Sequence, residues 1–507
     1  MGFTASEVES IVRSAGRSLP TVTRMKLRQM LRALGETEFA APSATPLGKL
    51  CAAGVDYGWS ELSRGRGEEL LSQTGARARR NMRRHLLRKL EWITRPCLEL
   101  EWTSFVLATD ALGFSGASGA RSQEPTFLGE RPGHRLLLLF KRFPVLARLW
   151  SIAIFQWLDN IVEVLERIAS DRAAISRFFF HGNAIGPIKN LRLGLSDPHG
   201  AGRSVTLIEF EGGRLVYKPR SGKSESSWFE LLAWMNRHRF EPKLRAARVL
   251  DRERYCWMEY FEAASCKSRA GVRRFYERLG GIIAAAYLLK AVDCHRQNLI
   301  ASGEYPLLVD VDALWHVSAL TKTQTLTEVL YRTGFFPTSK RRSLQSRSSV
   351  LGWGTTGSHL PRLNGRPAIA SLYVTEIIAG FSRGWSCLVG TPRRRSFFLK
   401  HVRRIRGQPR RWIYQATERY ASILRASVGP FALQSEGARE ALIAGLCSRS
   451  AVTPAVIRAE TKALRQLDLP YFLRTTAERM PADSRVVPTE LIDAIRNTVL
   501  SVRARPE

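Results

Sequence analysis

The fold is decided by the stretch LGGIIAAAYLLKAVDCHRQNLIASGEYPLLVDVDALWH, from Leu279 to His316. This stretch predicts a helix, a polar loop and a strand that is followed by acidic residues. Residues 282–289 are apolar with alanines interleaved, which is typical of a buried helix. Gly303 and Pro306 mark a turn. The apolar run 307–309 then predicts a short strand that delivers two carboxylates at its end.

The polar residues of this stretch fit the needs of phosphoryl transfer from ATP. That reaction needs an acid or base near the attacking hydroxyl, together with hard oxygen ligands for Mg²⁺. Asp293 suits the first role with His295 beside it, and Asn298 and Asp310 suit the second. Their order, followed by Asp312, resembles the catalytic loop and metal-binding strand of lipid kinases. For this stretch alone, a solvated loop with ordinary charges is the alternative.

Composition limits the class of protein. The chain has 507 residues, of which 44% are hydrophobic, so it is expected to be globular with two or three domains. Lysine and arginine number 78 against 45 aspartates and glutamates, which gives a net charge of +33. Such a charge predicts an acidic partner, unless the arginines only reflect the composition of a high-GC bacterial proteome.

Cysteine spacing and hydropathy predict a cytoplasmic protein without a membrane span. The seven cysteines are scattered and form no Cys-x-x-Cys pair, which indicates a reducing compartment and argues against a cysteine-built zinc site. Residues 1–10 lack the apolar run of a signal peptide. The most apolar stretch, residues 136–158, is interrupted by Lys141, Arg142 and Pro144, so a buried helix pair is expected there.

The first 125 residues predict a basic helical region. Its arginine-rich run, residues 76–93, contains a single aromatic residue, Trp92, so base stacking and nucleic-acid binding are not expected. The glycine- and serine-rich stretch 113–125 predicts a flexible joint and therefore a domain boundary.

Short strands separated by turns are predicted after Gly182. The connection 200–204, which includes Arg203 and Ser204, resembles the glycine-bearing hairpin that covers ATP phosphates in kinases, because glycine lets backbone N–H groups approach a phosphate. Lys218 ends the next strand, where a kinase places its phosphate lysine. The expected strands are residues 191–195, 205–210 and 214–218.

Two further segments complete the kinase-like order. A helix is expected at residues 228–238, and its Glu230 is a candidate partner of Lys218, with a solvent-facing glutamate as the alternative. Residues 254–260, which include Glu259, suit the strand and hinge that contact adenine. The agreement of lysine, hinge, catalytic loop and metal strand carries more weight than any one motif.

Five runs closely resemble the dehydratase domain of class II lanthipeptide synthetases. The resemblance extends over roughly residues 130–475 and is weaker before them. The runs are LSDPHGAGRSV (195–205), LVYKPRS (215–221), the stretch 287–316 quoted above, VLYRTGFFP (329–337) and DLPYF (468–472).

This resemblance implies an α+β fold: a lipid-kinase-like, two-lobed catalytic domain with a helical N-terminal region and additional C-terminal helices. Residues 1–125 would be the N-terminal region, residues 126–265 a helical segment with the N-lobe, and residues 266–507 the C-lobe with elimination elements. The family uses ATP and Mg²⁺ to phosphorylate Ser and Thr of a ribosomally made precursor peptide that carries a leader. It then eliminates phosphate to leave dehydroalanine or dehydrobutyrine.

The resemblance also implies two sets of site residues. The phosphorylation set matches the family at Lys218, Asp293, His295, Asn298 and Asp310, and Asp312 stands where many members have Glu. For elimination, Asp197 and His199 match an Asp-x-His pair, and RWIYQAT (411–417) matches Arg-x-Ile-x-Arg-x-Thr through Arg411 and Thr417.

The elimination set is chemically coherent. Elimination needs a base for the α-proton and cationic help for the departing phosphate, and the arginine fork suits phosphate. Gln415 replaces the second arginine of the family pattern, and Arg419 is a candidate to compensate.

Three hypotheses follow. The chain is a peptide dehydratase, a kinase of the same fold that stops at phosphate, or a non-catalytic basic scaffold that binds a leader peptide. Full-length family members continue into a zinc-dependent cyclase with Cys and His ligands that this chain lacks. Any lanthionine cyclase is therefore expected on another polypeptide.

Overall fold

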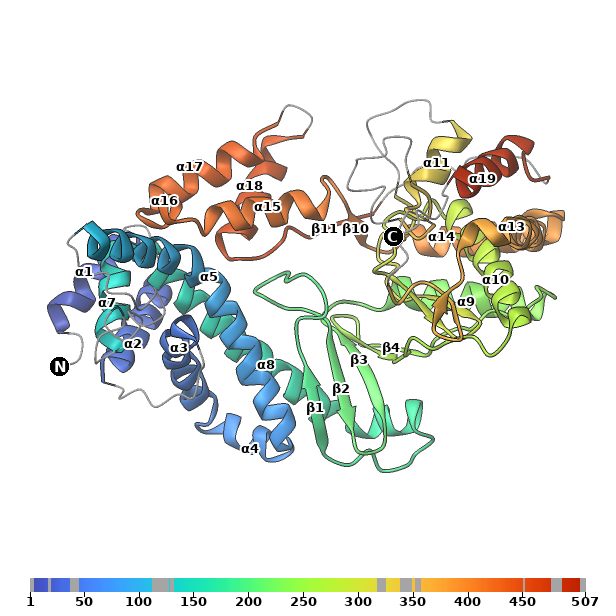
Figure 1. Cartoon of the computed structure of the whole chain (residues 1–507). Coiled ribbons are helices and arrows are strands. Elements are labelled where there is room, and N and C mark those ends of the chain that lie inside the picture. The colour runs from blue at the N-terminus through green and yellow to red at the C-terminus, as the bar shows by residue number, and fades with distance from the viewer. Residues whose placement is uncertain are drawn as a thin grey trace. The chain divides into compact units, whose positions relative to one another are not determined.

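The chain forms two compact units, each built from two segments. The first comprises residues 1–219 and 414–470, and the second comprises residues 220–413 and 471–507. The computed structural model describes residues 4–16, 20–36, 45–111, 127, 132–316, 325–337, 349–351, 357–449, 452–475 and 486–501. Helices dominate and the sheets are small, so the α+β class is confirmed (Figure 1). The joint predicted at 113–125 lies outside the described residues.

A bundle of helices opens the first unit. α8 packs against α1, α2, α3 and α5 of the same unit. It is the one helix of the described ranges whose length and apolarity would suffice to cross a membrane, yet 72% of the qualifying window is buried inside the protein. The bundle consists of α1 (Ala5–Ala15), α2 (Thr21–Glu36), α3 (Pro46–Leu62), α4 (Arg66–Ser72), α5 (Ala76–Ala111), α7 (Pro132–Arg142) and α8 (Pro144–Phe179).

The break between α7 and α8 falls where the sequence predicted it. Phe143 separates the two helices, and Pro144 occupies the first turn of α8, where its missing N–H costs nothing. The expected buried helix pair is therefore present. Figure 1 shows α5 and α8 as two long helices, and they contact each other directly.

Three antiparallel strands follow: β1 (Ile188–Arg192), β2 (Thr206–Phe210) and β3 (Arg214–Lys218). Leu191 pairs with Ile208, and Leu207 pairs with Val216. β3 has the predicted bounds, whereas β1 begins earlier than expected. It also ends earlier, because residues 194–195 bond to residues 204–205 at the base of a loop and so lie outside the ladder.

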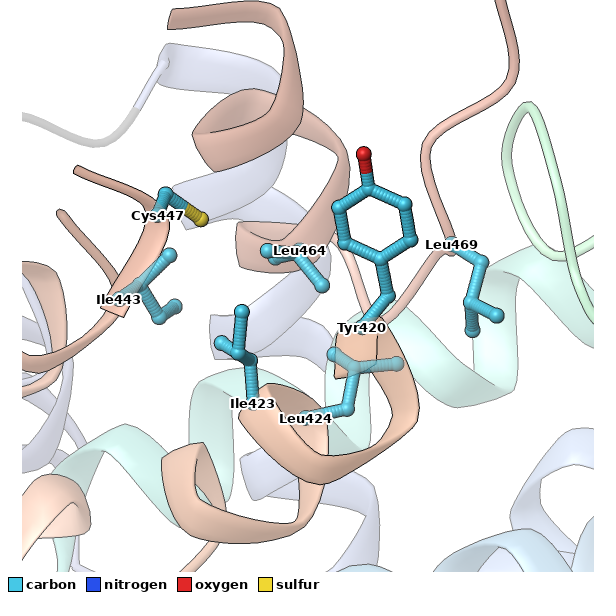
Figure 2. Close-up of a cluster of buried hydrophobic side chains, with 7 residues drawn as sticks. All are labelled: Tyr420, Ile423, Leu424, Ile443, Cys447, Leu464 and Leu469. Carbon is cyan, nitrogen blue, oxygen red and sulfur yellow. The ribbon is translucent and has the colours of Figure 1, made fainter. Parts of the chain in front are cut away.

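Four helices complete the first unit: α15 (Thr417–Ser427), α16 (Pro430–Leu433), α17 (Glu436–Cys447) and α18 (Pro454–Arg465). Figure 2 shows apolar side chains of α15, α17 and α18 converging on one cluster, and Leu469, just after α18, belongs to it. The cluster residues are Tyr420, Ile423, Leu424, Ile443, Cys447, Leu464 and Leu469. The segment after α18 is thereby anchored to a packed core.

The second unit is organised around the close pairing of α10 (Arg269–Leu288) with α13 (Val374–Val389). A Cβ at Gly280 would lie 2.1 Å from the Ile377 carbonyl oxygen, and one at Gly380 would lie 1.8 Å from the Glu277 carbonyl oxygen. Only glycine permits this approach, which explains the glycine just before the apolar run of the predicted helix and the one facing it on α13. The helix is longer than residues 282–289 because that run marks only part of its buried face.

After α10 the chain crosses a ten-residue loop into the hairpin of β6 (Leu299–Ser302) and β7 (Tyr305–Leu308). Gly303 takes φ +63° in the hairpin turn. The other elements of this unit are α9 (Lys223–Arg237), β4 (Val249–Asp251), β5 (Cys256–Glu259), α11 (Leu326–Arg332), β8 (Arg362–Leu363), β9 (Arg366–Pro367), η2 (Ala370–Tyr373), α14 (Pro392–Arg406), β10 (Arg410–Trp412), β11 (Phe472–Arg474) and α19 (Thr489–Ser501).

Candidate functional site

The predicted site residues are divided between the two units. The first unit contains Asp197, His199, Arg203, Ser204, Lys218 and Thr417. The second unit contains Glu259, Asp293, His295, Asn298, Asp310, Asp312 and Arg411. Each group is described within its own unit.

The loop after α10 places an acid and an imidazole together. Asp293 adopts φ +66°, a left-handed conformation that reverses the chain after the helix. His295 Nε2 lies 3.3 Å from Asp293 Oδ1. The backbone N–H of Gln297 donates to His295 Nδ1 at 3.3 Å, so Nε2 of the neutral ring carries the hydrogen that faces the carboxylate. Asn298 Nδ2 donates to the Asp293 carbonyl at 2.9 Å and stabilises the loop.

Two carboxylates follow β7 directly. The N–H of Val309 donates to the Asn298 carbonyl at 2.8 Å, which brings the end of β7 beside the loop. Burial and the negative charge of Asp310 raise the pKa of Asp312 to about 6, against the opposing charges of Arg220 and Arg411. Two carboxylates close enough to repel each other form a place where a cation is stabilised.

Arg220 forms ion pairs with both carboxylates. It was not identified as a site residue from the sequence. Its guanidinium contacts Glu225, which is fully buried on α9, and lies 2.5 Å from Asp310 and 3.6 Å from Asp312. Burial opposes its charge, but the three carboxylates raise its pKa well above the usual value. Arg220 belongs to the run LVYKPRS, so its place in that run was the available signal.

Arg411 reaches the same carboxylates from β10. Its Nη1 lies 3.4 Å from Asp293 Oδ2 and 3.9 Å from Asp312 Oδ2, and its backbone N–H donates to the Asp312 carbonyl at 3.0 Å. Burial would lower the pKa of Arg411, but the carboxylates of Asp312 and Asp293 raise it. Tyr471, from the DLPYF run, donates its hydroxyl to Asp312 Oδ2 at 3.2 Å. The arginine assigned to elimination thus contacts two residues assigned to phosphorylation.

The donor set suits a magnesium ion. Among the described residues no group of three or more His, Cys, Asp or Glu side chains could hold a metal. Mg²⁺, however, is usually bound by one or two carboxylates together with phosphate oxygens and water. Asp310 and Asp312 supply hard oxygens for such a site, and their mutual repulsion would be relieved by a cation.

In the first unit, His199 sits on the loop between β1 and β2. Its Nδ1 lies 2.8 Å from the carbonyl oxygen of Leu469. Arg203 forms an ion pair of 2.7 Å with Glu163 of α8, and the Ser204 hydroxyl accepts the N–H of Gly194 at 3.1 Å. Both side chains therefore support the loop itself, and their part in ATP binding stays a prediction.

The other predicted residues of the first unit lie near element ends. Lys218 ends β3 with its side chain buried, and Thr417 begins α15. Asp197 is exposed on the loop that carries His199. Gln415 has a buried Nε2 atom with no hydrogen-bond partner among the described residues, and Arg419 is exposed on α15.

Two predicted glutamates of the second unit pair with arginines. Glu259 ends β5 and lies 3.1 Å from Arg245, and its second oxygen accepts the N–H of Arg248 at 3.2 Å. Glu230, the suggested partner of Lys218, is exposed and lies 3.0 Å from Arg404 of α14. The solvent-facing alternative for Glu230 is therefore the observed one.

Comparisons with known proteins identify the family of the chain. The sequence profile of a family described as "Domain of unknown function (DUF4135)" matches residues 143–359 and 347–475, which is more than half of the chain. The chain is also 22% identical over 322 residues to the lacticin 481/lactococcin biosynthesis protein LcnDR2 of Lactococcus lactis subsp. lactis. That match covers 54% of this chain and 34% of the relative, so the chain spans about a third of the relative's length.

These matches confirm the resemblance to the lanthipeptide synthetase dehydratase domain that the motifs indicated. Their extent includes the loop after α10, both carboxylates that follow β7, and Arg411. The chain therefore belongs to the DUF4135 family.

Proposed function

We propose that this protein is a lanthipeptide dehydratase with a lipid-kinase-like, two-lobed fold. It uses ATP and Mg²⁺ to phosphorylate Ser and Thr of a ribosomally made precursor peptide, and then eliminates phosphate. The observation that carries the proposal is the gathering of Asp293, Asp310 and Asp312 around Arg411. The biosynthetic role named for the lactococcal relative supports the peptide substrate.

In the first half-reaction, Asp293 takes the proton of the peptide hydroxyl as that oxygen bonds to the γ-phosphorus and ADP leaves. His295 faces Asp293 Oδ1 and orients this carboxylate. Lys218 is assigned to the ATP phosphates. Mg²⁺, held by Asp310, Asp312 and the amide oxygen of Asn298, would supply the charge that neutralises the transferred phosphoryl group.

In the second half-reaction, a base removes the α-proton of the phosphorylated residue. The Cβ–O bond breaks as the Cα–Cβ double bond forms, and phosphate departs with the electron pair. Arg411 provides a permanently charged guanidinium for the leaving phosphate. His199 is the assigned base, with Asp197 beside it in sequence and Thr417 as a further hydroxyl of the elimination set.

One observation favours a second candidate, a peptide kinase that stops at the phosphorylated product. Gln415 stands where the family pattern has its second arginine, so one positive charge for the leaving phosphate is missing. The buried, unpartnered Gln415 Nε2 offers a neutral donor in its place. The two candidates differ in whether phosphate leaves the peptide.

Co-expression with the Ser-, Thr- and Cys-rich peptide expected to be encoded nearby distinguishes these candidates by mass spectrometry. A dehydratase yields peptide lighter than its precursor, whereas the kinase yields heavier peptide. Lys218→Ala and Asp310→Asn should each stop every modification, while Lys223→Ala, an exposed lysine at the start of α9, should not. Normal water loss in the Lys218 or Asp310 variant would remove the phosphorylation step from the account.

A further inference from the structure

The loop that carries His199 wraps around a carboxylate from a distant part of its own unit. Gly200, Ala201 and Gly202 take φ values of 55°, 73° and 76°. Backbone N–H groups in such a turn point to one side and form a concavity that binds anions. The N–H groups of Ala201 and Gly202 donate to the two carboxylate oxygens of Asp468 at 2.6 and 2.7 Å. The anion in this concavity is thus a side chain of the protein.

The backbone around Asp468 is fixed by a hydrogen bond to the preceding helix, and the residue is buried. It lies three residues after the end of α18, directly after the left-handed Leu467, and its N–H donates to the Ala463 carbonyl at 3.1 Å. The residue is 4% exposed. Burial raises the pKa of Asp468, and the two amides and the charge of Lys89 oppose this rise. Hydrogen bonds to a buried carboxylate are stronger than those between neutral groups.

The residue after Asp468 determines which nitrogen of His199 carries hydrogen. The N–H of Leu469 donates to the Pro198 carbonyl at 2.8 Å, and the Leu469 carbonyl lies 2.8 Å from His199 Nδ1. A carbonyl can only accept, so Nδ1 must donate. The neutral ring then has its lone pair on Nε2.

Side chains of helices α5 and α8 lie behind the loop that carries His199. Lys89 Nζ donates to Gln156 Oε1 at 3.0 Å, and a Cβ at Gly202 would lie 2.7 Å from that same oxygen. Asn160 Nδ2 donates to the Ala201 carbonyl at 3.1 Å. The loop therefore packs directly on α8, and Lys89 of α5 supports the α8 side chain that it meets, which limits the positions that the loop can take.

We propose that Asp468 is a positioning residue for phosphate elimination. Its carboxylate, bound by the Ala201 and Gly202 amides, fixes the loop so that the Leu469 carbonyl keeps hydrogen on Nδ1 of His199. Nε2 is then the atom that takes the α-proton as the Cβ–O bond breaks. This inference rests on the proposed function, because it assigns the proton transfer to His199. It also gives the N-terminal helical region a role, since α5 contributes Lys89.

The substitution Asp468→Asn, made in the whole chain, tests the contact between the Asp468 carboxylate and the Ala201 and Gly202 amides. Asparagine keeps the shape but turns an NH₂ group toward a backbone N–H, so one hydrogen bond is lost. Hydrogen exchange followed by mass spectrometry should show increased deuterium uptake in peptides covering residues 197–205. Elimination from a synthetic precursor peptide carrying phosphoserine should slow by about 10²-fold, the typical effect of a misplaced catalytic group. Phosphorylation should change far less.

Glu440→Gln is the matched control. Glu440 lies on α17 and pairs with Arg465 at 3.1 Å, so its substitution changes charge in the same helical group without touching the loop. It should leave both exchange and elimination unchanged. Unchanged exchange in Asp468→Asn, or an equal loss of both half-reactions, would overturn the positioning role.

A measurement on the unsubstituted protein covers the case in which Asp468→Asn does not fold. Nitrogen-15 NMR of histidine-labelled protein, with His199→Gln for assignment, should show hydrogen on Nδ1 of His199 at neutral pH. Hydrogen on Nε2 would overturn the inference whatever the catalytic result. If the NMR result holds but the protein never releases phosphate from the phosphoserine peptide, the proposed function fails, and the elimination role of Asp468 with it.

Discussion

Nη1 of Arg411 lies 3.4 Å from Oδ2 of Asp293, so the guanidinium assigned to phosphate departure contacts the carboxylate assigned to phosphate transfer. The sequence separates these residues by 118 positions and places them in different motifs. Under the proposed function, the two half-reactions would therefore share groups. Arg411, which is paired with Asp293 and Asp312 here, would then bind a phosphate once one forms nearby.

We therefore predict that Arg411→Ala slows phosphorylation as well as elimination. Loss of a charged group that stabilises the transition state typically costs on the order of 10²-fold in rate. Elimination should fall by this amount, and phosphorylation by a smaller factor, because Asp293 and Asp312 lose a neutralising partner. Single-turnover assays on unmodified and phosphoserine-containing peptide measure the two steps separately. Arg403→Ala, an exposed arginine on α14, is the control. Phosphorylation at the full rate in Arg411→Ala would contradict shared use of this side chain.

A second prediction concerns the metal and has a readout other than activity. Mg²⁺ with a non-hydrolysable ATP analogue should raise the melting temperature of the protein, because a ligand that binds only the folded state stabilises it. Asp310→Asn should lose most of this rise, since the amide cannot replace the charge. Asp493→Asn, an exposed aspartate on α19, should keep it. An equal rise in both variants would place the metal elsewhere.

Local elements were predictable where their pattern is short-range. β3 has the predicted bounds because a short apolar run, residues 215–217, ends in a Lys-Pro pair, which a strand cannot easily continue. β1 differed because residues 194–195 bond to residues 204–205 across a loop, and no pattern within β1 records that contact. Hydrophobic periodicity shows which face of a segment is buried. It does not show which other segment packs against that face.

The same distinction explains which site residues were found. Asp293 and His295 lie two residues apart, and Asp310 follows in the same loop-and-hairpin motif, so these residues were found together from the sequence. Arg220 contacts Asp310 across 90 positions, and Tyr471 contacts Asp312 across 159. Such partners are selected by tertiary packing. The chain contains many arginines, and the residues next to Arg220 in sequence do not indicate which carboxylates it contacts.

A third prediction tests the close pairing of α10 and α13. Gly280→Ala should destabilise the protein by about 1–3 kcal/mol, because the added methyl group would press on the backbone of α13. Gly445→Ala, at an exposed and open position of α17, should be neutral or stabilise by up to about 1 kcal/mol through helix propensity. Chemical unfolding of both variants gives the comparison. Equal effects of the two substitutions would mean that the helices separate easily at Gly280.

A fourth prediction concerns pH and His316, which is buried and stacks on Trp412 at 4.3 Å. Its Nε2 accepts the N–H of Ile413 at 3.2 Å, so the ring must stay neutral on that atom. Burial, helped by the charge of Arg332, lowers the pKa of His316 to about 4. An unfolded histidine titrates near 6.5, so between these values the unfolded chain binds more protons than the folded one.

The stability that this histidine contributes is therefore complete above about pH 6.5 and is lost as the pH falls toward about 4. Between pH 7 and pH 5 the loss should be about 2 kcal/mol, from the difference between the two pKa values. His316→Gln keeps an acceptor for the Ile413 N–H but does not titrate. Urea unfolding at both pH values should show a smaller loss in this variant than in the unsubstituted protein. Because Ile413 follows Arg411 on the same segment, equal losses would mean that the neutral ring does not hold this segment in place.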